Sequence, residues 1–187
     1  MMVHPSIERV LYGERGIIAG IASCVEAKCV MSALILLYSA IDAMAALTRG
    51  LADAESDGRD FQQWVRSYFL PQLAVPLSVE DLWGARCGVV HTYSPHSRLS
   101  HAHRARLLVY CWREGHRPDD AILANFAAQK HTIVLEIEAM VEAFHVAVER
   151  FSERIAQDPD LRRRVEHHVK GLLCYEPWNP VPILVSA

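Results

Sequence analysis

Arginine and histidine stand five positions apart near the middle of this sequence, at Arg86 and His91. Histidine takes up or releases a proton near neutral pH, and the planar guanidinium of arginine matches the oxygens of a phosphate group. Such a pair suits in-line attack at phosphorus, because the imidazole can accept the proton of a hydroxyl group while the guanidinium stabilises the more negative transition state. In RNA the substrate's own 2′-hydroxyl is the nucleophile, so this reaction needs no metal ion.

The segment that carries the pair is predicted to be one helix. Ser78 and Asp81 form a capping-box pattern at its start. Five steps of about 100° put Arg86 and His91 about 140° apart on an ideal helix. We therefore expect the two side chains to converge only if the helix end is distorted, or if a second copy of the helix faces the first in a homodimer.

A basic, histidine-rich stretch follows the pair. Its cationic side chains are expected to form a lip that contacts RNA phosphates, and an ordinary solvated loop explains them equally well. These residues are Arg98, His101, His103, Arg104 and Arg106.

Asp42 is a carboxylate within an otherwise apolar segment. One interpretation is a buried group satisfied by hydrogen bonds. The other is a supporting residue that orients Arg86 or His91. The sequence leaves both open.

Metal binding is the third kind of chemistry to weigh. The neighbouring histidines His96, His101 and His103 lack the cysteines or clustered carboxylates of a zinc site. Glu142 and His145 have the spacing of a di-iron helix, but no second copy of that motif occurs. We predict no metal site and no cofactor.

Hydrophobic periodicity predicts an all-α fold, with four to five main helices in an up-and-down bundle. The expected helices are roughly Ser6–Lys28 with a break near Gly13 or Gly20, Val30–Arg49, a helix containing Phe61–Phe69, Ser78–His91, a helix that starts at Pro118–Asp120, a long amphipathic helix over Ile133–Ile155, and a short charged helix or tail over Arg162–His168.

Two segments depart from the helical pattern. The compact apolar run from Leu107 to Trp112 predicts a short β element near 106–112. Residues 174–187 contain Pro177, Pro180 and Pro182 and are expected to form an extended C-terminal tail. The length of 187 residues fits a single domain over 1–187.

Composition narrows the function further. The net charge of −3 provides no global attraction for nucleic acid, so RNA contacts must come from a local patch. Five cysteines without a C-x-x-C pair fit neither a disulfide framework nor a zinc ribbon, and they favour a reducing cytoplasm. The apolar stretch from Val30 to Leu47 is interpreted as a buried helix and not as a membrane span, because Asp42 near its middle would be costly in lipid.

Two strings carry a resemblance to a known family. Tyr38-Ser-Ala-Ile-Asp42, and Ala85-Arg-Cys-Gly-Val-Val-His-Thr-Tyr-Ser94 with its R-x4-H pattern, resemble uncharacterised bacterial proteins of the HEPN superfamily (higher eukaryotes and prokaryotes nucleotide-binding domain). The resemblance covers roughly residues 10 to 155. It implies a helical bundle that dimerises so that two motifs share one cleft. It also implies a metal-independent endoribonuclease of the toxin or defence type.

The resemblance assigns roles to individual residues. Arg86 and His91 would be catalytic. Cys87 stands where many members carry a polar helper, and Tyr93 matches a tyrosine that a partner nucleotidyltransferase modifies in some toxins. The implied partners are an RNA substrate, a second copy of the chain, and an antitoxin or nucleotidyltransferase.

Two further hypotheses stay open. The same family contains catalytically inactive copies that only bind nucleotides or proteins, and Cys87 at the usually polar position favours that alternative. A metal-binding helical protein that uses the ten histidines is the other.

Overall fold

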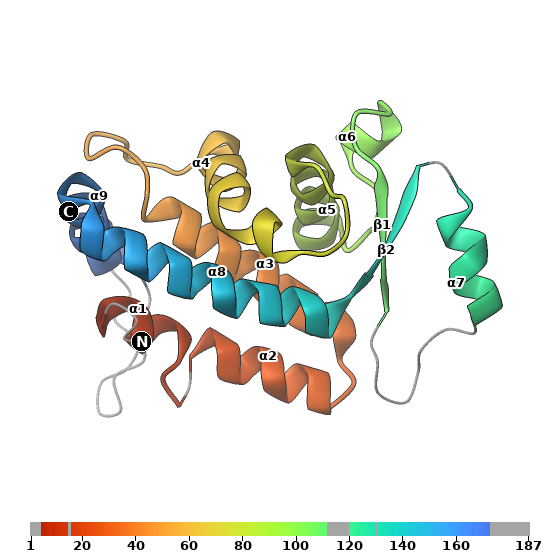
Figure 1. The fold of residues 1–187 in the computed structure, drawn as a ribbon, viewed down its shortest axis with the longest axis horizontal. Helices are drawn as coiled ribbons and strands as arrows, with labels where there is room; N and C mark the ends of the chain where they lie inside the picture. Colours follow the sequence, from red (N-terminus) through yellow and green to blue (C-terminus); the bar gives the residue numbers. More distant parts are fainter. Residues whose placement is uncertain (1–4, 15, 112–119, 130, 173–187) are drawn as a thin grey trace. The chain divides into compact units, whose positions relative to one another are not determined.

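The computed structural model describes residues 5–14, 16–111, 120–129 and 131–172, which are mostly helical with a small two-stranded sheet (Figure 1). The expectation of a mainly helical chain is confirmed, as is the short β element near 106–112. The up-and-down bundle itself stays a prediction. The expected tail at 174–187 and the expected helix start at Pro118–Asp119 lie outside the described residues. Within the described ranges, no helix is both long and apolar enough to cross a membrane.

The described residues fall into two compact units. The first comprises Met1–Asp60 and Val148–Ala187, and the second comprises Phe61–Ala147. The long helix α8 (Ile137–Gln157) contributes its first half to the second unit and its remainder to the first.

The first unit contains α1 (Pro5–Leu11), α2 (Ile17–Glu26), α3 (Val30–Ala46) and α9 (Pro159–His168). Helix α3 packs along α2 and buries Leu34, Leu37, Tyr38 and Ile41 at helical spacing. The expected break of the first helix is confirmed. It lies between α1 and α2, where a Cβ on Gly16 would collide with the backbone carbonyl of Leu11.

The second unit is built around an aromatic core. Helix α4 (Gly58–Trp64) continues into a π-helical segment (Val65–Phe69) and a 3-10 turn (Leu70–Gln72). Trp64 is buried, and its ring centroid lies 5.6 Å from that of Tyr68 and 6.1 Å from that of Phe144 on α8. The aromatic stripe of this segment is therefore core.

A parallel pair of strands completes the second unit. Strand β1 (Leu107–Cys111) pairs with β2 (Thr132–Glu136), so that Leu108 faces Ile133 and Cys111 faces Glu136. Parallel strands need a crossover connection, and α7 (Asp120–Ala127) lies in that connection and contacts β2.

The prediction of one helix over Ile133–Ile155 is wrong at its start. Residues Thr132–Glu136 form β2, and α8 begins only at Ile137. The spacing of four between Ile133 and Ile137 fits a helix, but Ile133 and Leu135 are both buried, which is the period-two pattern of a strand. Pairing with β1 satisfies the backbone N–H and C=O groups of this segment, so the segment forms a strand despite its helical spacing.

Candidate active site

Helix α5 (Val79–Thr92) carries the candidate pair, and its beginning is fixed by a capping box. The backbone N–H of Asp81 donates to Ser78 Oγ at 3.1 Å, and the backbone N–H of Ser78 donates to Asp81 Oδ2 at 2.9 Å. The helix ends at Tyr93, which adopts the left-handed conformation at φ 51°. The predicted boundaries of this helix are therefore confirmed.

Arg86 and His91 meet at the C-terminal end of α5. Arg86 Nη1 lies 2.6 Å from His91 Nε2. The expectation that they converge only through a distorted helix end or a second copy is wrong, because both lie within the helical span of one chain. The long, unbranched arginine side chain covers the angle between the two positions. Since a guanidinium only donates hydrogen bonds, a hydrogen bond between these two atoms requires Nε2 of His91 to be the acceptor.

Trp83 is a member of this site that the sequence analysis missed. The guanidinium carbon of Arg86 lies 5.2 Å from the centre of the Trp83 ring, within the range of a cation–π interaction. The Trp83 ring is itself supported by Phe61, whose ring centroid lies 5.2 Å away. The spacing of three residues between Trp83 and Arg86 on one helix was the available signal. Trp83 thus limits where the guanidinium can lie.

Gly88 allows the chain after α5 to fold back against the helix. A Cβ at this position would lie 2.5 Å from the carbonyl oxygen of Ser94 and 2.8 Å from that of His96. The carbonyl of Gly88 also accepts hydrogen bonds from Thr92 Oγ1 at 2.9 Å and from the backbone N–H of Ser94 at 3.1 Å. The loop at 94–96 is therefore held beside the segment that separates Arg86 from His91.

Arg106 has a structural role that the sequence did not predict. Its backbone N–H donates to Asp81 Oδ1 at 2.6 Å, and its guanidinium donates to Asp81 Oδ2 and to the Pro76 carbonyl. Burial raises the pKa of the Asp81 carboxyl, but the hydrogen bonds from Arg106 and Ser78 outweigh burial and hold that pKa below its usual value. The predicted RNA contact of Arg106 would have to compete with its ion pair to the buried Asp81 carboxylate.

The other members of the predicted basic lip are exposed. Arg98 and His101 lie on α6 (Arg98–His101), which packs against α5, and His103 and Arg104 follow directly. The rings of His96 and His101 stack with centroids 5.3 Å apart. These residues therefore lie on the solvent-facing surface of the second unit. A phosphate-binding lip requires this exposure, and a solvated loop would show it as well.

The three supporting residues have different surroundings. Cys87 is half-buried on α5, next to Arg86. Tyr93 is 64% exposed at the helix end. Asp42 is half-buried on α3 in the first unit, and its predicted orienting role stays a prediction.

Metal ligands do not cluster in the described part of the chain, where no group of three or more His, Cys, Asp or Glu side chains could hold an ion. Comparison with protein-family models, with curated proteins and with solved structures finds no match for this chain.

Proposed function

We propose that this protein is a metal-independent endoribonuclease in which Arg86 and His91 act on one phosphodiester. The observation that carries the proposal is the 2.6 Å approach of Arg86 Nη1 to His91 Nε2 at an exposed helix end. A general base and a phosphate-binding cation are thereby within reach of one bound group. The Trp83 ring and the Gly88 loop contact support their geometry.

The reaction follows from these two groups. A phosphate that binds Arg86 takes hydrogen bonds from the guanidinium and so leaves His91 Nε2 available as a base. His91 accepts the proton of the 2′-hydroxyl, the 2′-oxygen bonds to phosphorus, and the bond from phosphorus to the 5′-oxygen breaks. The leaving 5′-oxygen takes up a proton. The products are a 2′,3′-cyclic phosphate and a 5′-hydroxyl end.

A homodimer is part of the proposal, because the reaction needs a base and an acid at the same moment. One neutral His91 can accept the proton of the 2′-hydroxyl, and a second, protonated His91 can supply a proton to the leaving oxygen. Two copies of α5 across a two-fold axis would provide both. The exposed cations at Arg98, His101 and Arg104 would hold the flanking RNA backbone.

A second candidate function is a catalytically inactive module that binds a nucleotide or a protein. It is favoured by Cys87, which gives the position after Arg86 a half-buried thiol in place of a polar helper. In this alternative Arg86 still binds phosphate, but no bond is broken. The toxin or defence role, and an antitoxin or nucleotidyltransferase partner that would reach the exposed Tyr93, belong to the first candidate.

The deciding experiment incubates total RNA with the full chain in EDTA and analyses the 3′ ends of the fragments. We expect 2′,3′-cyclic phosphate ends from the wild type and a loss of roughly a hundredfold or more in His91→Ala. His167→Ala, which removes an exposed histidine of the first unit, is the matched control and should cleave normally. Equal cleavage by wild type and His91→Ala would contradict the mechanism. Phosphate binding without cleavage would favour the inactive module.

A further inference from the structure

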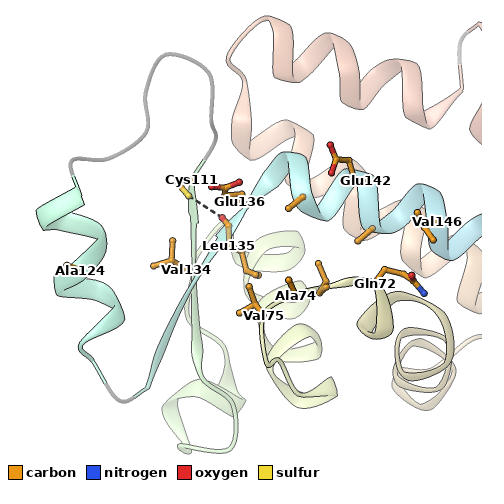
Figure 2. A pocket seen from close by; sticks show the side chains of 13 residues that line it. Gln72, Ala74, Val75, Cys111, Ala124, Val134, Leu135, Glu136, Glu142 and Val146 are labelled. Carbon is orange, nitrogen blue, oxygen red and sulfur yellow. Dashed lines mark hydrogen bonds between the residues drawn. The ribbon is translucent and has the colours of Figure 1, made fainter.

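The second unit contains a pocket that the proposed RNA site does not use (Figure 2). Its cavity volume of about 740 Å³ lies within the range of small-molecule sites. The walls come from β1 and β2, from the beginning of α8, from α7 and from the segment at 72–75 that follows the 3-10 turn. All of these residues belong to one compact unit.

Small side chains leave the space open. Alanines from three parts of the chain, the segment at 72–75, α7 and α8, line the pocket, and valines complete its apolar walls. These residues are Ala74, Ala124, Ala139, Ala143, Val75 and Val134. Val146 also lines the pocket and is 38% exposed. The pocket therefore offers apolar surface to an occupant, and covering that surface would stabilise the complex.

The polar groups of the pocket are mainly hydrogen-bond acceptors. Among the residues that the structure describes, Glu136 and Glu142 are the charged lining residues, and no described lysine, arginine or histidine lines the pocket. Gln72 donates one amide N–H to the Tyr68 carbonyl at 3.1 Å, and its amide group still offers an oxygen that can accept and a second N–H that can donate. The Cys111 thiol is directed to the Leu135 carbonyl at 3.6 Å, shown as the dashed line in Figure 2. A complementary occupant must therefore donate hydrogen bonds and carry positive charge.

We infer that this pocket binds a small amphiphilic cation, an apolar ring or chain that ends in a protonated amine. The alanine and valine walls would cover the apolar body, and the exposed carboxylate of Glu142 would pair with the ammonium group. The Glu142 carboxylate would repel a phosphate, so the pocket differs in charge preference from the Arg86–His91 site. The inference stands whether or not the protein cleaves RNA.

The test titrates the full chain with three probes of the same shape and different charge: phenylbutylamine, phenylbutanol and phenylbutyrate. Isothermal titration measures the affinity of each. We expect the amine to bind roughly two- to fivefold more tightly than the alcohol, which corresponds to an exposed ion pair. The butyrate should bind most weakly. Equal binding of the three probes, or tightest binding of the butyrate, would overturn the inference.

Three variants show whether the probe occupies this pocket. Glu142→Gln should abolish the preference for amine over alcohol and leave the alcohol affinity unchanged. Ala124→Leu adds bulk at an exposed position of α7 and should weaken both probes at least fivefold without unfolding the chain. Glu149→Gln, an exposed carboxylate of α8 that does not line the pocket, should behave as the wild type. Undiminished binding in both Glu142→Gln and Ala124→Leu would overturn the inference.

Discussion

Asp81 and Arg106 join the beginning of α5 to the chain just before β1. Both carboxylate oxygens of Asp81 are used, since Oδ1 accepts the backbone N–H of Arg106 at 2.6 Å and Oδ2 accepts Nε at 3.0 Å and Nη2 at 2.6 Å. The Asp81 side chain is 3% exposed and that of Arg106 is 35% exposed. Because Asp81 also caps α5, one buried carboxylate fixes the orientation of the helix that carries Arg86 and His91.

Replacing Asp81 should therefore destabilise the fold. Asp81→Ala removes the helix cap and leaves the backbone N–H of Arg106 without its partner, and we expect the free energy of unfolding to fall by about 2–4 kcal/mol. Urea denaturation monitored by circular dichroism measures it. Arg104→Ala, at an exposed neighbouring arginine, should change stability by about 0.5 kcal/mol or less. Equal losses in the two variants would contradict a structural role for the Asp81–Arg106 pair.

The Asp81 carboxyl group should also make the stability of the fold sensitive to acid. Its pKa is held below the usual value in the folded state by Arg106 and Ser78, despite burial. The stabilisation is therefore present above the unfolded pKa of about 3.9 and is lost as the pH falls through the folded pKa. We expect unfolding free energy measured from about pH 5 downward to decline less steeply in Asp81→Asn than in the wild type. An unchanged slope would mean that other carboxylates dominate.

His168 should make the stability of the first unit depend on pH in a higher range than Asp81 does. Its Nε2 lies 3.1 Å from the Gly50 carbonyl, and burial together with the charge of Arg49 lowers the pKa of His168. A histidine with a lowered folded pKa stabilises above its unfolded pKa of about 6.5, and this contribution declines as the pH falls toward the folded pKa. His168→Gln should remove this part of the stability–pH curve, whereas His131→Gln, at an exposed histidine of the second unit, should retain it. Parallel curves for the wild type and His168→Gln would contradict the prediction.

The sequence predicted the elements with the strongest local signals. The capping box of Ser78 and Asp81, the glycine break after α1 and the apolar run of β1 each depend on neighbouring residues, and each is confirmed. Strand β2 was missed because its identity depends on pairing with β1 across a crossover, which a local pattern does not contain. Ile133 satisfied the helical period by coincidence.

In the candidate site, too, the sequence predicted features that depend on nearby residues and missed a contact between distant ones. Arg86 and His91 were predicted as candidates from their residue types and spacing, and the structure brings their side chains together. Trp83 was missed although it lies three residues from Arg86, since an aromatic residue on a helix is ordinarily core. The Arg106–Asp81 pair spans 25 positions, and no sequence period connects residues so far apart.

Gly88 should be intolerant of substitution. The Cβ of Gly88→Ala would meet two backbone oxygens, those of Ser94 and His96, and backbone cannot move aside as cheaply as a flexible side chain. We expect a loss of about 1–3 kcal/mol in unfolding free energy, together with reduced RNA cleavage because the loop beside His91 shifts. Gly171→Ala, where an added Cβ meets nothing within 4 Å, is the control and should leave both unchanged. Wild-type stability in Gly88→Ala would show that the loop relaxes freely.

Arg86→Lys separates the shape of the guanidinium from its charge. Lysine keeps the positive charge but loses the planar fork that can bind two phosphate oxygens and lie over the Trp83 ring. We expect kcat for RNA cleavage to fall at least about tenfold in Arg86→Lys, and about a hundredfold or more in Arg86→Ala, because the lost donors act on the transition state. Arg163→Lys, at an exposed arginine of the first unit, is the control and should remain within about twofold. If Arg86→Lys and Arg86→Ala raised KM alone and left kcat unchanged, Arg86 would bind RNA equally in the ground state and the transition state. The arginine would then be a binding residue, and catalysis would have to come from His91 and its surroundings.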